Sequence, residues 1–216
     1  MTRAERLTRA TVIGKALSRA DTEGLDAVTI RALATELDVT PMALYWHFRN
    51  KEELLDGMVD AIYAEFDLAI DKTEPWPEQL RTVLTSVVTV LRRHPSAPRL
   101  LNSRQVNTDS TLATVEIALD VLARAGFSTH RATEIARHLL STTIALVSDS
   151  LFVEETDVDR QRVVEAELRA LPADRYPRIV AAAGPLSTCA NRDDYFTNGI
   201  ELLIGGVRHL AERQSL

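Results

Sequence analysis

The side chains that could carry chemistry in this chain concentrate between Thr29 and Leu55, where hydroxyl, basic and aromatic residues recur on short predicted helices. Hydroxyl and basic groups bind phosphate oxygens, and apolar side chains contact the edges of bases. The chemistry that such a set supports is non-covalent recognition. The chain therefore offers a binding surface before it offers a catalytic centre.

Catalysis is not indicated elsewhere in the sequence. The five histidines are isolated from one another, and no HExxH, GxSxG, GxGxxG or phosphate-loop pattern accompanies them. The single Cys189 can form neither an internal disulfide nor a cysteine metal cage, and it suits a reducing compartment. We expect no enzyme activity, no cofactor and no metal site.

Two helices and a tight turn must position the binding surface. Thr29 can cap a helix whose apolar residues recur every three or four positions as far as Leu37, the spacing of one buried face. Asp38 is a weak helix former. Thr40 then offers a second cap, with Pro41 at the first helical position, where its missing N–H costs nothing. This spacing predicts a helix-turn-helix, which lays its second helix in the major groove of DNA.

The second helix is only about two turns long, because Asn50 with Glu53 forms a new cap that resembles a capping box. Leu44 and Phe48 share one face and are its core candidates, with Val39 sealing the turn beneath them. Tyr45 or Trp46 alone could pack on the preceding helix. The five other residues of this helix that could contact a partner cannot all be buried at once, and they are Pro41, Met42, Tyr45, Trp46 and His47.

Charge is distributed unevenly along the 216 residues. The formal net charge is -6, but residues 1–51 carry +2 and residues 52–216 carry -8. Residues 1–20 hold five basic groups against one acidic group, which suits contact with phosphates or, for the first five residues, a solvated basic tail. The positive end of the chain is the helix-turn-helix end.

The rest of the chain predicts helix after helix, and no strand alternation or repeat is present. The pattern indicates an all-α fold of one or two domains. No apolar run is long enough to span a membrane and the N-terminus lacks a signal peptide's apolar core, so we expect a cytoplasmic protein. The expected helices cover 8–23, 51–71, 76–94, 109–125, 128–153 and 193–212.

The run from Thr29 to Leu55 resembles the DNA-binding module of the TetR (tetracycline repressor) family of bacterial transcription regulators. Its Leu44-Tyr45-Trp46-His47 core, followed by Asn50-Lys51 and two leucines, is most similar to the tetracycline repressors. Weaker similarity to their ligand domain lies at 75–77, 125–128 and 196–204. The resemblance implies a helix-turn-helix DNA-binding domain over 1–51, a helical ligand-binding and dimerisation domain over 52–216, and a connecting helix over about 51–71.

The resemblance also implies a set of DNA contacts. Pro41, Met42 and Ala43 are expected nearest the base edges, with Trp46 supporting that groove face. Because few of these groups donate hydrogen bonds to bases, thymine methyls and DNA shape should matter more than bidentate recognition. The remaining residues are expected mainly on phosphates, and they are Thr29, Arg31, Thr40, Tyr45, His47 and Lys51.

A homodimer is implied as well. The helices over 128–153 and 193–212 resemble the pair that forms a four-helix bundle across a two-fold axis in this family, and Gly205-Gly206 would permit close backbone approach. A two-fold dimer would also set two recognition helices about one helical turn of DNA apart. The alternative is that both helices form the core of a single protomer.

The effector is expected to be mostly apolar. Tetracycline repressors hold a drug–metal complex with a histidine early in the short helix after the second proline breaker, and Arg99 to Arg104 contains none. We therefore expect binding without metal. Asp149 suggests a donor or cationic group on the ligand, unless it is a surface or dimer-edge carboxylate. The expected lining is Val83, Val87, Leu100, Leu101 and Ala118, with Asn102, Gln105 and Asp149 as polar anchors.

These features together predict a ligand-responsive regulator that binds a palindromic operator as a homodimer and is released by a small, mostly apolar effector. Its partners would be double-stranded operator DNA, the effector and a second copy, without membrane. Two alternatives stay open: an activator that binds DNA with its ligand, and a DNA-binding protein without effector.

Overall fold

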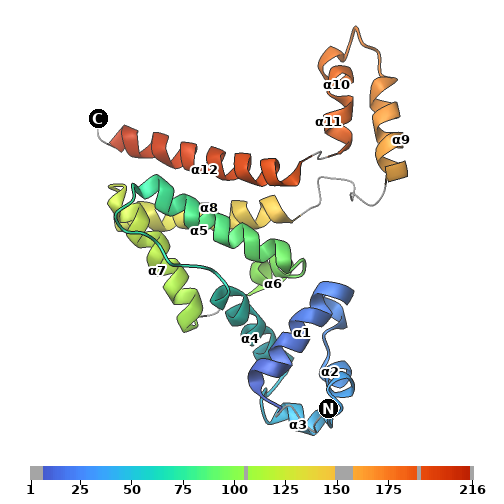
Figure 1. The fold of residues 1–216 in the computed structure, drawn as a ribbon, viewed down its shortest axis with the longest axis vertical. Helices are drawn as coiled ribbons and strands as arrows, with labels where there is room; N and C mark the ends of the chain where they lie inside the picture. The colour runs from blue at the N-terminus through green and yellow to red at the C-terminus, as the bar shows by residue number, and fades with distance from the viewer. Residues whose placement is uncertain (1–6, 105–106, 149–157, 189–190, 215–216) are drawn as a thin grey trace.

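Every regular element that the structure describes is a helix. The computed structural model describes residues 7–104, 107–148, 158–188 and 191–214, and no strand occurs among them (Figure 1). The all-α expectation is confirmed. A small N-terminal bundle lies at one end of the molecule, a larger helical body lies in the middle, and a unit formed by residues 158–187 projects at the other end (Figure 1).

Side-chain caps fix where the helices of the N-terminal bundle begin. Thr8, Thr29, Thr40 and Asn50 each accept the backbone N–H three residues further on, at 2.8–3.3 Å. Each bond satisfies a donor that the first helical turn leaves without a partner. The elements are α1 (Arg9–Glu23), η1 (Leu25–Ala27), α2 (Ile30–Glu36), α3 (Pro41–Tyr45) and the start of α4 (Lys51–Ala64).

The turn between α2 and α3 is closed by a residue in the left-handed region. Asp38 has φ +53°, and among the described residues it is the non-glycine residue with positive φ. The N–H of Val39 donates to the carbonyl of Ala34 at 2.9 Å, and the N–H of Asp38 donates to Thr35 at 3.3 Å. This pair of bonds is a Schellman motif, which usually places glycine where Asp38 stands.

Helix α4 is shorter than the sequence pattern suggested, because it ends at Ala64 rather than near Asp71. The N–H groups of Glu65 and Phe66 bond to carbonyls three residues back, so the last turn tightens. Phe66 is then buried with its ring edge-on to Tyr63, 5.1 Å between centroids. The N–H of Asp67 donates to Ser86 Oγ at 2.7 Å, which ties the departing chain to α5. Tertiary contacts therefore override the helical pattern here.

The helical body is built around α5, which packs against α7, α8 and α12. One face of α5 contributes Leu80, Leu84 and Val88 to a core shared with α7, α8 and α12. Pro95 and Pro98 mark the break after it, and Gly126 takes φ +91° between the end of α7 at Arg124 and the start of α8 at Thr129. The elements are α5 (Trp76–Arg93), α6 (Ala97–Ser103), α7 (Asp109–Arg124), α8 (Thr129–Val147) and α12 (Arg192–Gln214).

The other face of α5 completes a second core that runs into the N-terminal bundle. Val87, Val90 and Leu91 belong to one buried cluster with Leu55, Met58, Val59 and Ile62 of α4 and with residues of α1, α2 and α3. Leu100 and Leu101 of α6 close it. The two parts of the molecule are therefore not separate packing units, since α4 belongs to both.

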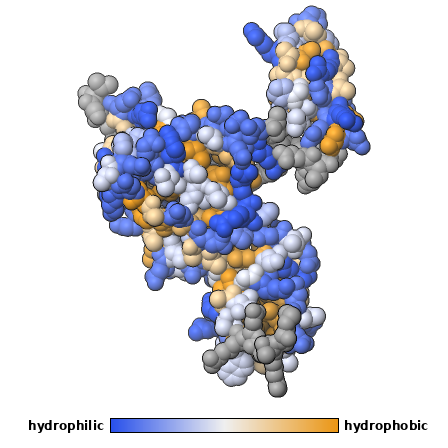
Figure 2. All heavy atoms as spheres, viewed as in Figure 1, coloured by the Kyte–Doolittle hydropathy of each residue, from blue (hydrophilic) through white to orange (hydrophobic). Residues whose placement is uncertain are grey.

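Helices α9, α10 and α11 pack mainly on one another and stand apart from the body (Figure 1). Figure 2 shows apolar side chains on the outside of this projecting unit, and Val163 and Leu186 are exposed there. An exposed apolar surface of this kind commonly marks a contact with another molecule. The bounds are α9 (Val158–Arg169), α10 (Pro177–Ala181) and α11 (Ala183–Ser187).

The turn makes a direct prediction about stability. Asp38→Gly should equal or exceed the parent in free energy of unfolding, since glycine adopts positive φ without steric cost. Asp38→Val should lose about 1–2 kcal/mol, because a branched side chain clashes in the left-handed region. Asp38→Asn removes only the charge and should be close to neutral. Urea unfolding measures all three, and a valine variant as stable as the glycine variant would contradict the assignment.

Candidate functional site: a helix-turn-helix surface and an apolar cavity

The outer face of α3 is exposed, as its pattern predicted. Trp46 is 85% exposed, Met42 67% and Tyr45 48%, whereas Leu44 and Phe48 are fully buried beneath them. Pro41 is exposed as well, and Ala43 and His47 are half-buried. A helix of little more than one turn with this much apolar surface in solvent is organised for contact with another molecule.

Contacts from α1 and α4 hold this short helix in place. The guanidinium of Arg9 lies 4.4 Å from the centre of the Phe48 ring, donates to the carbonyl of His47 at 2.8 Å and pairs with Glu53 at 2.9 Å. Glu53 also accepts the N–H of Arg49 at 2.8 Å. That bond, together with Arg9, lowers the pKa of the Glu53 carboxyl, so its pair with Arg9 persists to lower pH than an ordinary glutamate would allow.

The ion pairs reveal which basic groups of the N-terminal bundle are free. Arg9 pairs with Glu53, and Lys15 and Arg19 pair with acidic partners at Glu36 and Glu23. Arg31, Arg49 and Lys51 make no ion pair within the described residues. Arg49 is exposed just after α3, and the sequence analysis missed it because charge counts do not show pairing. Free cations beside an exposed apolar helix suit phosphate contact.

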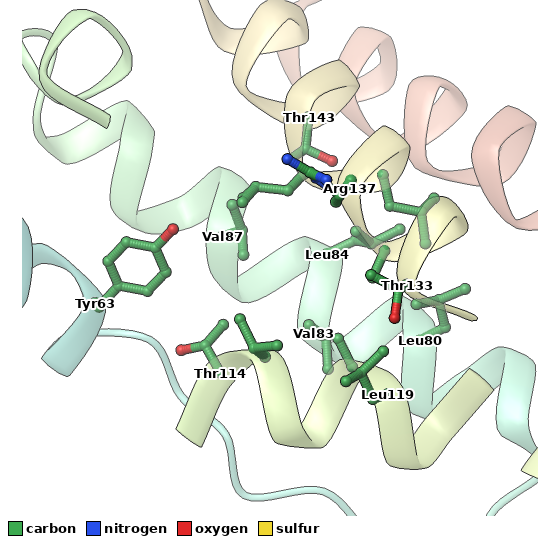
Figure 3. A pocket seen from close by; sticks show the side chains of 15 residues that line it. Tyr63, Leu80, Val83, Leu84, Val87, Thr114, Leu119, Thr133, Arg137 and Thr143 are labelled. Carbon is green, nitrogen blue, oxygen red and sulfur yellow. The ribbon is translucent and has the colours of Figure 1, made fainter. Parts of the chain in front are cut away.

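The second site is a cavity of about 130 Å³ enclosed by α4, α5, α7 and α8 (Figure 3). The predicted residues Val83, Val87 and Ala118 line it. Leu100, Leu101 and Asn102 do not line it, and Leu100 and Leu101 are buried instead in the core shared with the N-terminal bundle. Gln105 and Asp149 lie outside the described residues.

Few polar groups reach this cavity. Thr114 and Thr133 donate to backbone carbonyls of their own helices at 3.0 and 2.9 Å. Thr143 is fully buried and its hydroxyl has no hydrogen-bond partner in the described structure. Leaving such a group unsatisfied costs about 1–3 kcal/mol. Tyr63 turns its hydroxyl toward the cavity from α4, and burial raises its pKa (Figure 3).

A wider and more polar cavity of about 370 Å³ adjoins the first one. Tyr63, Val115, Arg137 and Leu140 line both, so they form the junction between the two. Leu101, Asn102 and Arg104 line the wider one, which places two of the predicted α6 residues here instead. Arg104 pairs with Asp56 and Glu52 of α4 at 2.6 and 2.5 Å, and these partners raise its pKa.

Neither a metal-binding cluster nor a bilayer-spanning helix is found in the described part of the chain. No group of three histidine, cysteine, aspartate or glutamate side chains is close enough to share a metal ion there. No helix within the same residues has the length and apolar character that crossing a bilayer requires.

Comparison with known proteins covers both parts of the chain. Residues 14–58 match the model for bacterial regulatory proteins of the tetR family, and residues 70–211 match the tetracyclin repressor-like C-terminal domain. The tetracycline repressor protein class E from Escherichia coli is 31% identical over 74% of this chain and 76% of its own length. An HTH-type transcriptional regulator from Saccharopolyspora erythraea is 27% identical over 93% and 84%.

Solved structures agree with those matches. ActR from Streptomyces coelicolor in complex with actinorhodin superposes with a TM-score of 0.82 at 27% identity, covering 95% of this chain and 99% of that one. A TetR variant from Acinetobacter baumannii in complex with minocycline gives 0.68 at 26% identity, covering 95% and 99%. With the helix-turn-helix surface and the cavity in the places described, the chain belongs to the TetR family of transcriptional regulators.

Proposed function

We propose that this protein is a repressor that binds a palindromic operator as a homodimer and leaves it when a small, mostly apolar effector enters the α4–α8 cavity. The observation that carries this proposal is the continuity of one buried core from α3 through α4 to α5. A ligand that shifts α4 cannot leave α3 where it was, because interiors are close-packed.

The operator contacts follow from the α3 surface. Its apolar side chains face solvent together, and the free cations at Arg31, Arg49 and Lys51 flank them. We infer that Met42 and its neighbours lie against base edges while the cations and hydroxyls hold phosphates. On this proposal residues 1–51 are the DNA-binding domain and 52–216 the regulatory domain, with α4 starting at the boundary.

Dimerisation is supported by one exposed face of α12 and not by how apolar the helix is as a whole. Ile200, Ile204 and Val207 are buried within the protomer, so they do not call for a partner. The opposite face keeps Leu202, 79% exposed, in line with Gly205 and Gly206, and a side chain at either glycine would meet open space. A stripe of this kind lets a second helix approach closely. The projecting α9–α11 unit also exposes apolar side chains.

Effector binding is supported by the cavity and by two structural neighbours. ActR is described in complex with actinorhodin, and the Acinetobacter baumannii TetR variant in complex with minocycline. The cavity of this chain is lined almost wholly by apolar carbon, which favours an apolar ligand body. The alternative is activation by the ligand, since the same shift of α4 could instead bring the two recognition helices of the dimer to the spacing that the operator requires.

The operator surface can be tested by salt dependence. With an operator selected from a random DNA pool, Lys51→Ala should weaken binding to all sequences and lower the slope of log affinity against log salt by about one unit. Met42→Ala should instead change the sequence preference. Arg178→Ala removes an exposed cation from α10 and is the control. Unchanged affinity in both Lys51→Ala and Tyr45→Ala would mean that α3 does not face the operator.

The dimer has its own test. Leu202→Arg should shift the protein toward monomer in analytical ultracentrifugation and weaken operator binding at least roughly tenfold, because the two recognition helices are no longer linked. Leu186→Arg replaces another exposed leucine, on α11, with the same charge. It is the matched control that shows whether α12 or the projecting α9–α11 unit carries the dimer contact. A Leu202→Arg protein that stays dimeric with full affinity would remove α12 from the interface.

Regulation is tested by reciprocal binding. In a screen of apolar amines, macrolide-like and polyketide-like compounds and magnesium-tetracycline, a compound that stabilises the protein should lower operator affinity by roughly 5- to 150-fold. Ala118→Phe fills the cavity and should abolish that effect, whereas Ala113→Phe on the exposed side of α7 should not. Tight binding without any change in operator affinity would refute the regulatory role.

A further inference from the structure

One side chain stands out at the junction of the two cavities. Arg137 extends from α8 and lines both of them, and its guanidinium makes no ion pair or hydrogen bond within the described residues. The neighbouring arginine on the same helix differs, since Arg131 pairs with Glu134 at 2.8 Å. Arg137 is thus an exposed cation without an ion pair among the described residues, at the edge of a cavity whose walls are almost entirely carbon.

The charged side chains that line the two cavities, among the described residues, have one sign. Of the groups lining either cavity, those with a charge at neutral pH are Arg137 and Arg104, and Arg104 is already held by Asp56 and Glu52. No carboxylate lines either cavity among the described residues. A cationic ligand would find no counter-charge in these walls, whereas an anionic ligand would find a guanidinium.

A second polar group points to the same ligand. Thr143 keeps its hydroxyl free although the two other threonines of the cavity use theirs on their own helices. Figure 3 shows Thr143 and the Arg137 guanidinium on the same side of the cavity, with Leu80 and Leu119 across from them. The two residues are six positions apart, which is about 9 Å along a helix. A ligand whose body fills the space between them would lie within reach of the Arg137 guanidinium, and a rotation of the Thr143 side chain to another staggered rotamer would bring its buried hydroxyl to the same ligand.

We propose that the effector is an apolar ring compound bearing one carboxylate or comparable anionic oxygen, which pairs with Arg137 while an oxygen elsewhere on the ligand accepts from Thr143. This inference rests on the proposed function for the location of the effector. It differs from the cationic group that Asp149 suggested. Arginine suits the task because its planar fork binds a carboxylate through two parallel hydrogen bonds and remains charged throughout the neutral range.

The experiment compares ligands that differ only in charge. Calorimetry of the full chain would use 2-naphthoate, 2-naphthamide and 2-naphthylmethylammonium, and the three corresponding anthracenes. The acid should bind about tenfold more tightly than the amide, since hydrogen bonds between charged groups are the stronger class. Arg137→Gln should remove that preference without changing amide binding, and Arg137→Lys should keep part of it. Arg131→Gln is the matched control on α8 and should behave as the parent.

Thr143→Val tests the hydroxyl separately. The free protein should be at least as stable as the parent by thermal unfolding, because an unsatisfied buried donor is removed. The affinity of the best acid should nevertheless fall severalfold. A merely structural role for Thr143 would move stability and affinity together, and an affinity that does not change would remove Thr143 from the site.

The outcomes distinguish this inference from the proposed function. Acid and amide that bind equally and both weaken operator binding would overturn the anionic effector and leave the repressor intact. Preference for the ammonium compound would overturn it in the opposite direction. An acid that binds through Arg137 but leaves operator affinity unchanged would sustain Arg137 as the anchor of an anionic ligand and refute the regulatory role. An Arg137→Gln protein that retains full acid preference would show that another group carries the charge.

Discussion

The constraint on which the rest of the structure depends is that α4 has only one apolar surface to share between two functions. Leu55, Met58 and Ile62 complete the core of the DNA-binding bundle and the core beneath α5 at once. Because the buried side chains at this shared surface are close-packed, a displacement at one end of the molecule requires a displacement at the other. On the proposed regulation, coupling between effector and operator needs no separate pathway, because these shared core residues are themselves the coupling element.

Local chemistry explains why the sequence predicted so much of the fold. The caps at Thr29, Thr40 and Asn50 act over three residues, and the buried pair Leu44 and Phe48 lies within one turn and a half, so their patterns are visible without the fold. The end of α4 was predicted wrongly because it depends on distant partners, the Phe66 ring against Tyr63 and the N–H of Asp67 on Ser86. A helix end that is fixed by contacts with distant residues, as here, leaves no local pattern in the sequence.

The candidate site follows the same division. Val83, Val87 and Ala118 line the cavity as predicted, because α5 and α7 both border it as the resemblance implied. Arg49, Arg137 and Thr143, which the proposals add, were not predicted, because what marks them is the lack of an ion pair for the two arginine side chains and of a hydrogen bond for the Thr143 hydroxyl within the described residues. A sequence shows that an arginine or threonine is present, but its pairing is decided by residues tens of positions away. The sequence therefore predicted the apolar lining of the cavity better than the polar side chains beside it.

The shared core also limits how this regulator can be recombined. A new DNA-binding head joined at residue 51 would meet Leu54, Leu55 and Met58 of α4 with its own side chains, whereas the present cluster is completed by α1 of the discarded head. Leu100 and Leu101 of α6 belong to the same cluster. A functional chimera must carry over the buried faces of the original head and exchange only the exposed surface of α3, so retargeting is a matter of grafting side chains rather than domains.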